Sequence, residues 1–432
     1  MHDGTLYRIQ TALVGLILIL LIDIYAYQAV RIASSRFHVF LKNFVRGLYW
    51  SMTGFTVFIL FWINTVGIAD EKSKQWIIIV LGILYFSKVF LILVLLVDDV
   101  RRGVHFTRRY FKRLRETPSL QRGSRISRSE FFARAAIFSW SVPLVPLSFG
   151  IISGAHNFHV RRKVIYLPHL PKSFDGISLG QISDIHAGSL FNKKAIQGGV
   201  ELLMREKPDL IFFTGDLVNV ETREVNNYIN IFDKVKADHG VFSVTGNHDY
   251  GNYREWPNDA AKKRNLEAMI GAHRQMGYDL LMNEHRMLEL GGEKIAIIGV
   301  ENWGIGPPIR FPKYGKLKEA HLGTGDAAVK ILLSHDPTHW DAQIRPEFSD
   351  IDLTFAGHTH GYQIGVSIGD FTWSPAKYRF KQWAGLYQEG NQYLYVNRGF
   401  GCIGYPGRIG MPPELTIIEL KRGTGNGPDG NG

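Results

Sequence analysis

The sequence contains a single cysteine, Cys402, among its 432 residues. One thiol excludes an internal disulfide, and the lack of further cysteines argues against a structural zinc module. Cysteine usage therefore carries no information about the compartment in which the protein works. Because cysteine is among the residue types most often buried, we expect Cys402 to be a free, buried thiol.

Acidic residues are scarce in one part of the chain only. The net charge is +11, but residues 1–160 hold 19 Lys and Arg against 8 Asp and Glu, whereas residues 161–432 hold 31 of each kind. The basic surface typical of nucleic-acid-binding proteins is therefore not expected on the second part, and we expect no nucleic-acid partner. The positive charge instead flanks long apolar runs, which predicts a membrane part followed by a neutral soluble part.

Long apolar runs occur within the first 155 or so residues. A membrane-spanning helix needs about 20 mostly apolar residues. Four stretches meet this requirement: 12–30, 48–69, 76–97 and 131–154. The fourth contains Pro143 and Pro146, which remove helix hydrogen bonds and predict a kink.

The basic residues between these runs predict an orientation. The link after the first run carries Arg31, Arg36, Lys42 and Arg46 without an acid, and the link after the third run is basic over 101–128. Positive residues tend to stay on the cytoplasmic side of a membrane. We therefore expect a multi-pass protein of the inner (plasma) membrane, with everything after the fourth span outside the cytoplasm.

Two smaller features bear on this orientation. The segment 127–140, SRSEFFARAAIFSW, resembles a twin-arginine export signal in which Ser129 replaces the second arginine. The basic run 161–163, directly after the fourth span, weakly favours the opposite orientation.

Other features of the membrane part have open interpretations. Residues 101–116, RRGVHFTRRYFKRLRE, form either a basic amphipathic helix on an anionic lipid surface or a solvated basic loop. Asp23 and Lys88 fall inside predicted spans, where ionisable groups are costly and often functional. They form a structural pair, belong to a proton or ion path, or mark a shifted helix boundary.

From about Pro168 onward, short apolar runs alternate with helical stretches such as 195–207 and 260–276. This alternation predicts an α/β domain with a layered sheet, and in such sheets function lies at the ends of the strands. Polar residues follow the apolar runs of ISLGQISD, DLIFFTGD, GVFSVTGNHD, VKILLSHD and IDLTFAGHTH: Asp184, His186, Asp216, Asn247, His248, Asp249, His335, His358 and His360. Carboxylate, amide and imidazole groups together suit a borderline divalent metal such as Mn, Fe or Zn.

The ordered motifs SDIH, TGD, TGNHD, SHD and AGHTH resemble those of the calcineurin-like metallophosphoesterases over roughly residues 165–420. The closing NRGFG and RIGMPPELTIIEL, with Arg408, resemble the membrane-associated and exported bacterial branch. The resemblance implies a four-layer α/β/β/α sandwich with a dinuclear metal centre. We accordingly expect a transmembrane helical domain at 1–155, a metallophosphoesterase domain at 160–422 and a disordered tail at 423–432.

The same resemblance implies roles for single residues. The implied metal ligands are Asp184, His186 and His360 for one ion, Asn247, His335 and His358 for the other, and Asp216 as a bridge between them. Two ions about 3.5–4 Å apart can hold phosphoryl oxygens and convert a bridging water to hydroxide near neutral pH. His248 would stabilise the developing charge or protonate the leaving oxygen, and Asp249 would orient the ring of His248.

Several neighbouring residues also carry expectations. Gly215, Gly246 and Gly357 each precede a ligand, where we expect sharp turns with dihedral angles that glycine tolerates. Tyr362 replaces the second glycine of the branch pattern GHTHGGQ, and either lines the substrate pocket or is a tolerated surface residue. The segment 371–387, FTWSPAKYRFKQWAGLY, mixes aromatic and basic residues that bind a phospholipid headgroup, contact the bilayer, stack on a nucleobase, or pack over the sheet edge.

These observations predict a membrane-anchored dinuclear-metal phosphoesterase that hydrolyses a phosphomonoester, phosphodiester or pyrophosphate. Membrane anchoring favours an envelope or lipid-linked substrate, with membrane lipids as partners. One alternative is a cytoplasmic-face pyrophosphohydrolase of a nucleotide-linked lipid, in the manner of the UDP-2,3-diacylglucosamine hydrolases. Another is a membrane transport or sensor protein whose metal domain only binds a ligand. His248 argues against the latter, because a binding module needs no additional acid.

Overall fold

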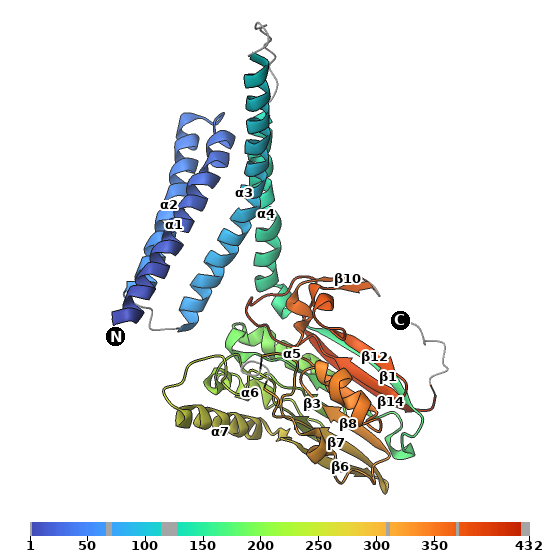
Figure 1. Ribbon diagram of the computed structural model, residues 1–432. Helices are drawn as coiled ribbons and strands as arrows, with labels where there is room; N and C mark the ends of the chain where they lie inside the picture. Colours follow the sequence, from blue (N-terminus) through green and yellow to red (C-terminus); the bar gives the residue numbers. More distant parts are fainter. Residues whose placement is uncertain (1, 66–70, 114–127, 308–311, 369–370, 425–432) are drawn as a thin grey trace. The chain divides into compact units, whose positions relative to one another are not determined.

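The computed structural model describes residues 2–65, 71–113, 128–307, 312–368 and 371–424 (Figure 1). The chain divides into two compact units, Met1–Ser148 and Phe149–Gly432. We call the first the helical unit and the second the α/β unit, and describe each by itself.

The helical unit is built from long apolar helices. They are α1 (His2–Ala33), α2 (Val39–Thr65), α3 (Glu71–Arg113) and α4 (Arg128–Ile152), whose last residues belong to the α/β unit. Each contains a stretch long and apolar enough to cross a membrane. The four predicted apolar helices are therefore confirmed, and the protein is a membrane protein.

Helix boundaries differ most from the sequence prediction in α2 and α3. Helix α2 begins at Val39 rather than at residue 48, so Lys42 and Arg46 of the expected link are helical, while residues 66–69 of the expected span lie outside the described residues. Helix α3 continues through residues 101–113, where the sequence left a helix or a loop open. Helix α4 is continuous in spite of Pro143 and Pro146.

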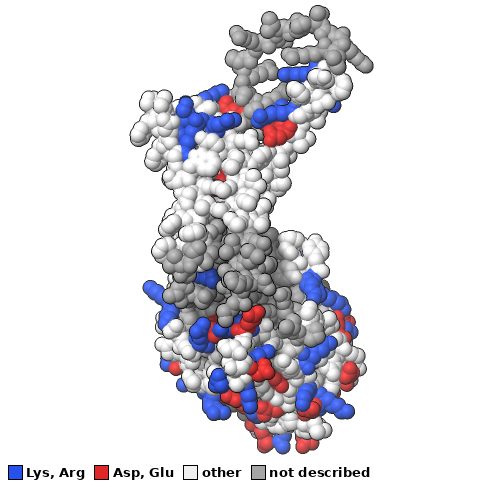
Figure 2. All heavy atoms as spheres, turned by 60° about the vertical axis from the view of Figure 1, so that its left-hand side comes forward, with Lys and Arg blue, Asp and Glu red and all other residues white. Residues whose placement is uncertain are grey.

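Charged side chains gather at one end of the helical unit. Arg36 pairs with Glu130 at 2.7 Å, and the Tyr25 hydroxyl donates to Asp99 at 2.6 Å. These contacts join the later part of α1 to the later part of α3, and the turn after α1 to the start of α4. Figure 2 shows blue side chains concentrated there, next to an uncharged stretch of the helices, whereas both signs mix over the α/β unit.

Asp23 and Lys88 form a buried pair inside the helical unit. The Lys88 Nζ lies 2.5 Å from Asp23 Oδ1, and the hydroxyls of Thr53 and Tyr85 donate to Asp23 Oδ2 at 2.7 and 2.9 Å. The Lys88 amine also lies 4.3 Å from the centre of the Tyr85 ring. The structure thus shows the pair that the sequence left as one of several interpretations.

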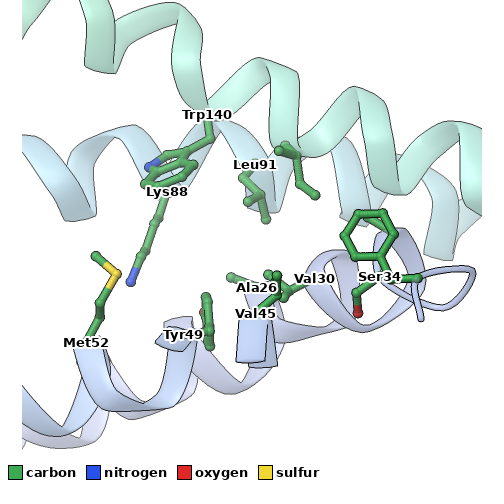
Figure 3. Close-up of a pocket in the computed structure, with 12 residues that line it drawn as sticks. Ala26, Val30, Ser34, Val45, Tyr49, Met52, Lys88, Leu91 and Trp140 are labelled. Carbon is green, nitrogen blue, oxygen red and sulfur yellow. The ribbon is translucent and has the colours of Figure 1, made fainter. Parts of the chain in front are cut away.

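Beside this pair lies a mostly apolar cavity of about 270 Å³. Its walls come from α1, α2, α3 and α4, and include Ala26, Tyr49, Leu91 and Trp140. In Figure 3 the Lys88 side chain extends between Tyr49 and Met52, so its charge lies at the margin of the cavity.

The α/β unit contains two six-stranded sheets among its described residues. Its helices are α5 (Lys193–Arg205), α6 (Ile229–Phe232), α7 (Asp259–Met276), α8 (Leu317–His321) and α9 (Arg345–Glu347). Its short helical turns are η1 (Gly154–His156), η2 (Lys172–Phe174), η3 (Ala187–Ser189), η4 (Thr222–Val225), η5 (Trp340–Ile344), η6 (His360–Gln363) and η7 (Pro375–Tyr378). The two longest helices, α5 and α7, begin at asparagines whose side chains accept a backbone N–H of the first turn.

The first sheet has the order β1-β14-β2-β3-β4-β5, and the second has the order β12-β13-β9-β8-β7-β6. Strands of the first sheet are β1 (His159–Leu167), β2 (Ser178–Ile182), β3 (Leu210–Phe213), β4 (Val241–Ser243), β5 (Asp279–Leu280) and β14 (Glu414–Arg422). Strands of the second are β6 (Glu284–Leu290), β7 (Glu293–Gly299), β8 (Val329–Leu333), β9 (Leu353–Ala356), β12 (Gly385–Glu389) and β13 (Gln392–Val396). The strands β10 (Val366–Ile368) and β11 (Phe371–Trp373) form a separate antiparallel hairpin.

Alternation of apolar side chains along the strands produces the layers. In β3, Leu210 and Phe212 face the core between the two sheets, while Ile211 and Phe213 face the core under α5, α6 and α7. The outer face of the second sheet packs on α8 and η5 through residues such as Ala320. The expected four-layer α/β/β/α sandwich is therefore confirmed (Figure 1).

Candidate metal centre

The ends of parallel strands from both sheets deliver the polar side chains to one place. Strands β2, β3 and β4 run parallel in the first sheet, and β7, β8 and β9 run parallel in the second. The segments after β2, β3, β4, β8 and β9 carry the residues that the sequence analysis selected. Because parallel strands end at the same edge of a sheet, these segments meet above the carboxyl ends of both sheets.

Asp184, His186 and His360 form the first group of possible ligands. Their ligand atoms all lie within 4.8 Å of one another, and all three residues are buried. The Nε2 atoms of His186 and His360 are 3.0 Å apart, and His360 Nε2 lies 3.2 Å from Asp184 Oδ1. Two imidazole nitrogens and a carboxylate oxygen thus converge on one point, as the ligands of a divalent cation do.

Asp216, His335 and His358 form the second group, with the same 4.8 Å limit. The Nε2 atom of His335 lies 3.1 Å from Asp216 Oδ2 and 3.3 Å from His358 Nδ1. The two histidines of the AGHTH motif therefore belong to different groups, as the resemblance implied.

Asp216 lies between the two groups. Its Oδ2 atom is 3.1 Å from His335 Nε2 in one group and 3.5 Å from His186 Nε2 in the other. Its Oδ1 atom accepts the backbone N–H of His248 at 2.9 Å, which fixes the carboxylate plane. A carboxylate held in this way can contact a cation on each side.

The protonation of this cluster shows that it attracts positive charge. Burial favours neutral His335, but the carboxylates of Asp216 and Asp184 outweigh it and raise the pKa of His335 to about 10. For Asp184, burial raises the pKa, yet His360 and His335 bring it below its ordinary value. The two buried carboxylates therefore favour positive charge in the cluster, on an imidazole ring or on a bound cation.

Two further observations fit a bound metal. The Oδ1 atom of Asn247 is buried without a hydrogen-bond partner among the described residues, while its Nδ2 donates to the Tyr253 hydroxyl at 2.6 Å. His186 Nδ1 lies 3.1 Å from Asn219 Oδ1, and His335 Nδ1 lies 2.7 Å from Thr214 O. Since each Nδ1 donates to an oxygen, the lone pair of the neutral ring is at Nε2, which is the atom in the cluster.

The backbone of the ligands is strained. Asp184, His186, Asp216, His358 and His360 all have positive φ, between 47° and 69°. Such conformations cost on the order of 1–3 kcal/mol each in a non-glycine residue. The fold retains these conformations at five residues of one site. The cost in backbone stability is therefore accepted in exchange for the positions of the side chains.

The expectation for the three glycines needs a correction. Gly215 has φ +92°, but Gly246 and Gly357 do not have positive φ. A Cβ atom at Gly246 would lie 2.2 Å from Asp216 Oδ1, and one at Gly357 would lie 2.2 Å from Asp184 Oδ2. These two positions require glycine because a ligand carboxylate packs directly on their backbone, whereas the ligands themselves take the left-handed conformation.

His248 lies at the rim of the cluster and is held by residues other than the one expected. Its Nδ1 is 2.6 Å from the Asn219 carbonyl oxygen, and its ring stacks on Tyr253 with 4.0 Å between ring centres. The family resemblance implied that Asp249 orients this ring. Neither the Asn219 carbonyl nor the Tyr253 ring has a recognisable signal in the sequence.

Asp249 instead holds the loops that carry the ligands. Its carboxylate accepts the backbone N–H groups of Asp216, Leu217 and Gly246 at 2.8–3.0 Å. Burial and the neighbouring Asp216 charge raise the pKa of Asp249 to about 7, against the opposing effect of these N–H donors. Asp249 therefore joins the segment after β3 to the segment after β4.

Arg408 is a buried residue that contacts His360 and the backbone beside the site. Its guanidinium donates to the carbonyl oxygens of Arg398, Gly399 and Gly401, and its Nη2 lies 3.5 Å from His360 Nδ1. The side chain is 1% exposed. Arg408 therefore fixes residues 398–401 against the segment that carries His360.

Aromatic residues lie beside the cluster on one side. The Phe380 ring is 5.6 Å from the His358 ring, and the Tyr362 ring is 6.3 Å from that of Phe380. Tyr362 is 44% exposed and has φ +53°. The departure from the GHTHGGQ pattern thus places an exposed aromatic ring two contacts away from a possible metal ligand.

Comparisons with known proteins agree with this geometry. A family model described as "Probable Calcineurin-like phosphoesterase, transmembrane domain" matches residues 8–155, and one described as "Calcineurin-like phosphoesterase" matches residues 177–362. The uncharacterized metallophosphoesterase YkuE of Bacillus subtilis is 31% identical over 270 residues, which cover 62% of this chain and 86% of that protein.

A second relative shares the membrane character. A Danio rerio protein named "Transmembrane protein with metallophosphoesterase domain" is 27% identical over 67% of this chain, and this chain spans 63% of its length. Among solved structures, a dimetal phosphatase from Danio rerio covers 52% of this chain and 88% of its own at 12% identity, with a TM-score of 0.33, too low to support an argument.

Proposed function

Because this chain belongs to the calcineurin-like phosphoesterase family and is a metal-dependent phosphoester hydrolase, we propose that two divalent cations act together in one site. The first would be held by Asp184, His186 and His360, the second by Asn247, His335 and His358, with Asp216 shared. The mixture of carboxylate, amide and imidazole ligands favours Mn, Fe or Zn over Mg or Ca. The scissile bond belongs to a phosphomonoester, phosphodiester or pyrophosphate.

The observation that carries this proposal is the position of Asp216. One carboxylate oxygen lies within 3.5 Å of a histidine nitrogen from each group. Bound divalent ions would supply Lewis-acid polarisation of the phosphoryl oxygens and a water of lowered pKa. The chain itself contributes the fixed positions of the ligands, which Asp249 and Arg408 hold through backbone contacts.

His248 is the residue we assign to proton transfer. Its Nδ1 donates to the Asn219 carbonyl, so its Nε2 is the atom left to act on a leaving oxygen. As an imidazolium, Nε2–H can donate a proton to that oxygen or stabilise its negative charge. Asp249 is a positioning residue in this scheme, because it holds the Asp216 backbone and makes no described contact with the His248 ring.

We further propose that residues 1–155 form the membrane domain and residues 160–422 the catalytic domain, outside the cytoplasm at the plasma membrane. Support comes from the basic end of the helical unit, where α1 ends and α4 begins. If that end is cytoplasmic, α4 leaves the membrane on the other side. The basic run after α4 does not oppose this, because Arg161 and Arg162 are paired with Glu414 and Glu206 within the fold.

A cysteine at an exposed position tests this orientation. Cys402 is buried, and burial raises the pKa of its thiol, so the natural cysteine is a poor target for a maleimide. A Leu322→Cys variant offers a thiol at a site that is 78% exposed. Labelling by a membrane-impermeant maleimide in intact spheroplasts is expected, and labelling only after detergent opening would overturn the orientation.

The decisive test of the reaction is the Asp216→Asn variant. Loss of the shared charge should abolish hydrolysis of p-nitrophenyl phosphate and bis(p-nitrophenyl) phosphate, while the circular dichroism spectrum of the full chain stays that of the wild type. His169→Ala is the matched control, since its side chain is 53% exposed and pairs with Asp352 rather than with the metal ligands. Full activity in Asp216→Asn would reject the shared-carboxylate assignment.

A further inference from the structure

An exposed apolar surface surrounds the β10–β11 hairpin. Ile368 is 74% exposed, Phe371 63%, and Tyr378 of η7 76%. Ile364 and Tyr362, at the start of the same segment, are 41% and 44% exposed. We call these five residues the hairpin surface. Single exposed apolar residues are common, but a group of them on one segment marks an interaction site.

The hairpin surface is tied to the end of the last apolar helix. The final residues of α4 belong to the α/β unit, and the Gly150 carbonyl accepts the backbone N–H of Arg408 at 3.1 Å. The next residue, Ile409, accepts from Gly365 and donates to Gln363, both at 2.8 Å. Two short steps of backbone hydrogen bonding therefore connect the end of α4 to the hairpin.

That end of α4 is itself apolar and exposed. Phe149 and Ile152 are 63% and 76% exposed, and the candidate membrane span extends to His156. If α4 crosses the bilayer as its length and composition allow, a surface bonded to its end lies near the level where the helix leaves the bilayer. The occupant that covers the hairpin surface is therefore the lipid surface of the same membrane.

Charge near the hairpin surface suits anionic headgroups. Lys377 and Arg379 flank Tyr378, with their charged groups 5.4 Å from the Tyr378 ring and 5.5 Å from the Phe380 ring. Basic side chains interleaved with aromatic rings are typical of the interfacial layer, where rings enter the headgroup region and cations meet lipid phosphates.

The same segment ends at the metal site. His360 lies four positions before Ile364, and the Tyr362 and Phe380 rings lead from the hairpin surface to His358. A molecule whose apolar part stays in the bilayer would meet these rings before its phosphate met the ligands. The position of the hairpin surface thus favours phosphoesters whose apolar part stays in the bilayer while the phosphate reaches the ligands.

We propose that the hairpin surface docks on the bilayer and holds the mouth of the metal site at the lipid–water interface, so that the enzyme acts on amphiphilic phosphoesters while their apolar chains remain in the membrane. This inference rests on the proposed function for its substrate class, whereas the docking itself is independent of catalysis. The two parts are tested separately.

Fluorescence quenching tests the docking. The full chain is placed in nanodiscs that contain phosphatidylglycerol, with an environment-sensitive dye on Phe371→Cys, and brominated lipids serve as quenchers. Leu322→Cys is the matched control, because Leu322 is 78% exposed on the α8 side of the unit. We expect a blue-shifted, at least twofold quenched emission at position 371 and none at position 322. Equal quenching at the two positions would overturn the docking.

Paired substrates test the consequence for catalysis. Methyl and hexadecyl esters of p-nitrophenyl phosphate share one scissile bond and differ only in the apolar chain. The double variant Ile368→Ser/Phe371→Ser should lose about tenfold in kcat/KM on the hexadecyl ester in vesicles and nothing on the methyl ester, and Leu322→Ser should lose neither. An unchanged hexadecyl rate overturns the substrate inference. A wild-type chain that cleaves neither diester overturns the substrate inference, and one that also fails to cleave p-nitrophenyl phosphate contradicts the proposed function, while the quenching result still decides the docking.

Discussion

Both units bury charged side chains, but they compensate the charge in opposite ways. In the helical unit, Asp23 receives the Lys88 amine and the hydroxyls of Thr53 and Tyr85, so every oxygen has a donor. In the α/β unit, imidazole nitrogens face one another at 3.0 and 3.3 Å, and the Asn247 side-chain oxygen has no described partner. The hydrogen-bonding groups of the Asp23 cluster are all paired, whereas the cluster in the α/β unit leaves ligand atoms that a bound cation would satisfy.

This difference separates a structural polar cluster from a binding site. Buried polar groups normally find partners, because an unpaired one costs about 1–3 kcal/mol. A cluster that brings imidazole nitrogens and carboxylate oxygens together on a strained backbone is stabilised when a cation arrives. The Asp23–Lys88 pair has no such need, which favours the structural interpretation over an ion path.

The largest expected effect is on catalysis at the open cluster. His248→Ala should lower kcat by about 10²–10⁴-fold, since proton transfer by a positioned side chain contributes that much. The metal content measured by mass spectrometry should not change, because His248 is not a proposed ligand. A parallel loss of metal and activity would instead place His248 among the ligands.

The next effect is on the stability of the closed cluster. Lys88→Met leaves Asp23 buried without its cation, and should destabilise the helical unit by about 3–5 kcal/mol. The double variant Asp23→Leu/Lys88→Met should recover most of that loss, because no charge remains to be compensated. Thermal unfolding in detergent measures both variants. Hydrolysis of a soluble ester should continue in each, and a stable Lys88→Met protein would contradict the closed pair.

Metal removal should act on the α/β unit alone. A ligand present at 100 times its Kd stabilises the folded state by about 2.7 kcal/mol. Chelation should therefore lower the unfolding temperature of the α/β unit and leave that of the helical unit unchanged, as followed by differential scanning calorimetry. If the chelator shifted both transitions equally, the contrast between the clusters would be lost.

The smallest expected effect is a change in stability with pH, caused by Glu414, a buried and fully paired carboxylate of the α/β unit. Glu414 is buried, and although burial raises its pKa, Arg398 and Arg161 bring it below the ordinary value. A lowered folded pKa means that this carboxylate stabilises the fold fully above about pH 4.5, and that the stabilisation is lost as the pH falls from there through the lower folded pKa.

Thermal unfolding from pH 7 down through the range below about pH 4.5 measures the contribution of this carboxylate to stability. The wild type should lose stability more steeply with falling pH than Glu414→Gln, which is less stable at pH 7 because it leaves Arg398 without its counter-charge. Identical slopes for the two proteins would show that Glu414 does not titrate in this range.

Much of the fold follows from local patterns. Apolar runs of spanning length identify the four membrane helices, and strands such as β3 appear in the sequence as short apolar runs followed by Gly-Asp. The predicted start of α2 was wrong. Lys42 and Arg46 suggested a link between two spans, but both are helical, and Arg46 donates to the Arg31 carbonyl across the turn. Pairing between distant elements overrode the local charge signal.

The site residues were recognisable because each follows a strand, but their supports were not. Asn219 acts on His248 through a backbone carbonyl, which every residue possesses, and Tyr253 acts through stacking on a neighbouring loop. Asp249 was recognisable from its motif, but it contacts backbone N–H groups and not, as had been expected, the His248 ring. Long-range contacts of this kind depend on how two loops meet, and one sequence does not specify that.

The most direct measurement is the metal content of the purified full chain after loading with manganese and removal of free ions. We expect two manganese ions per wild-type chain by mass spectrometry, and fewer than two in Asp216→Asn with the fold intact. A wild-type chain that retains one ion or none under saturating manganese would contradict the shared two-cation centre.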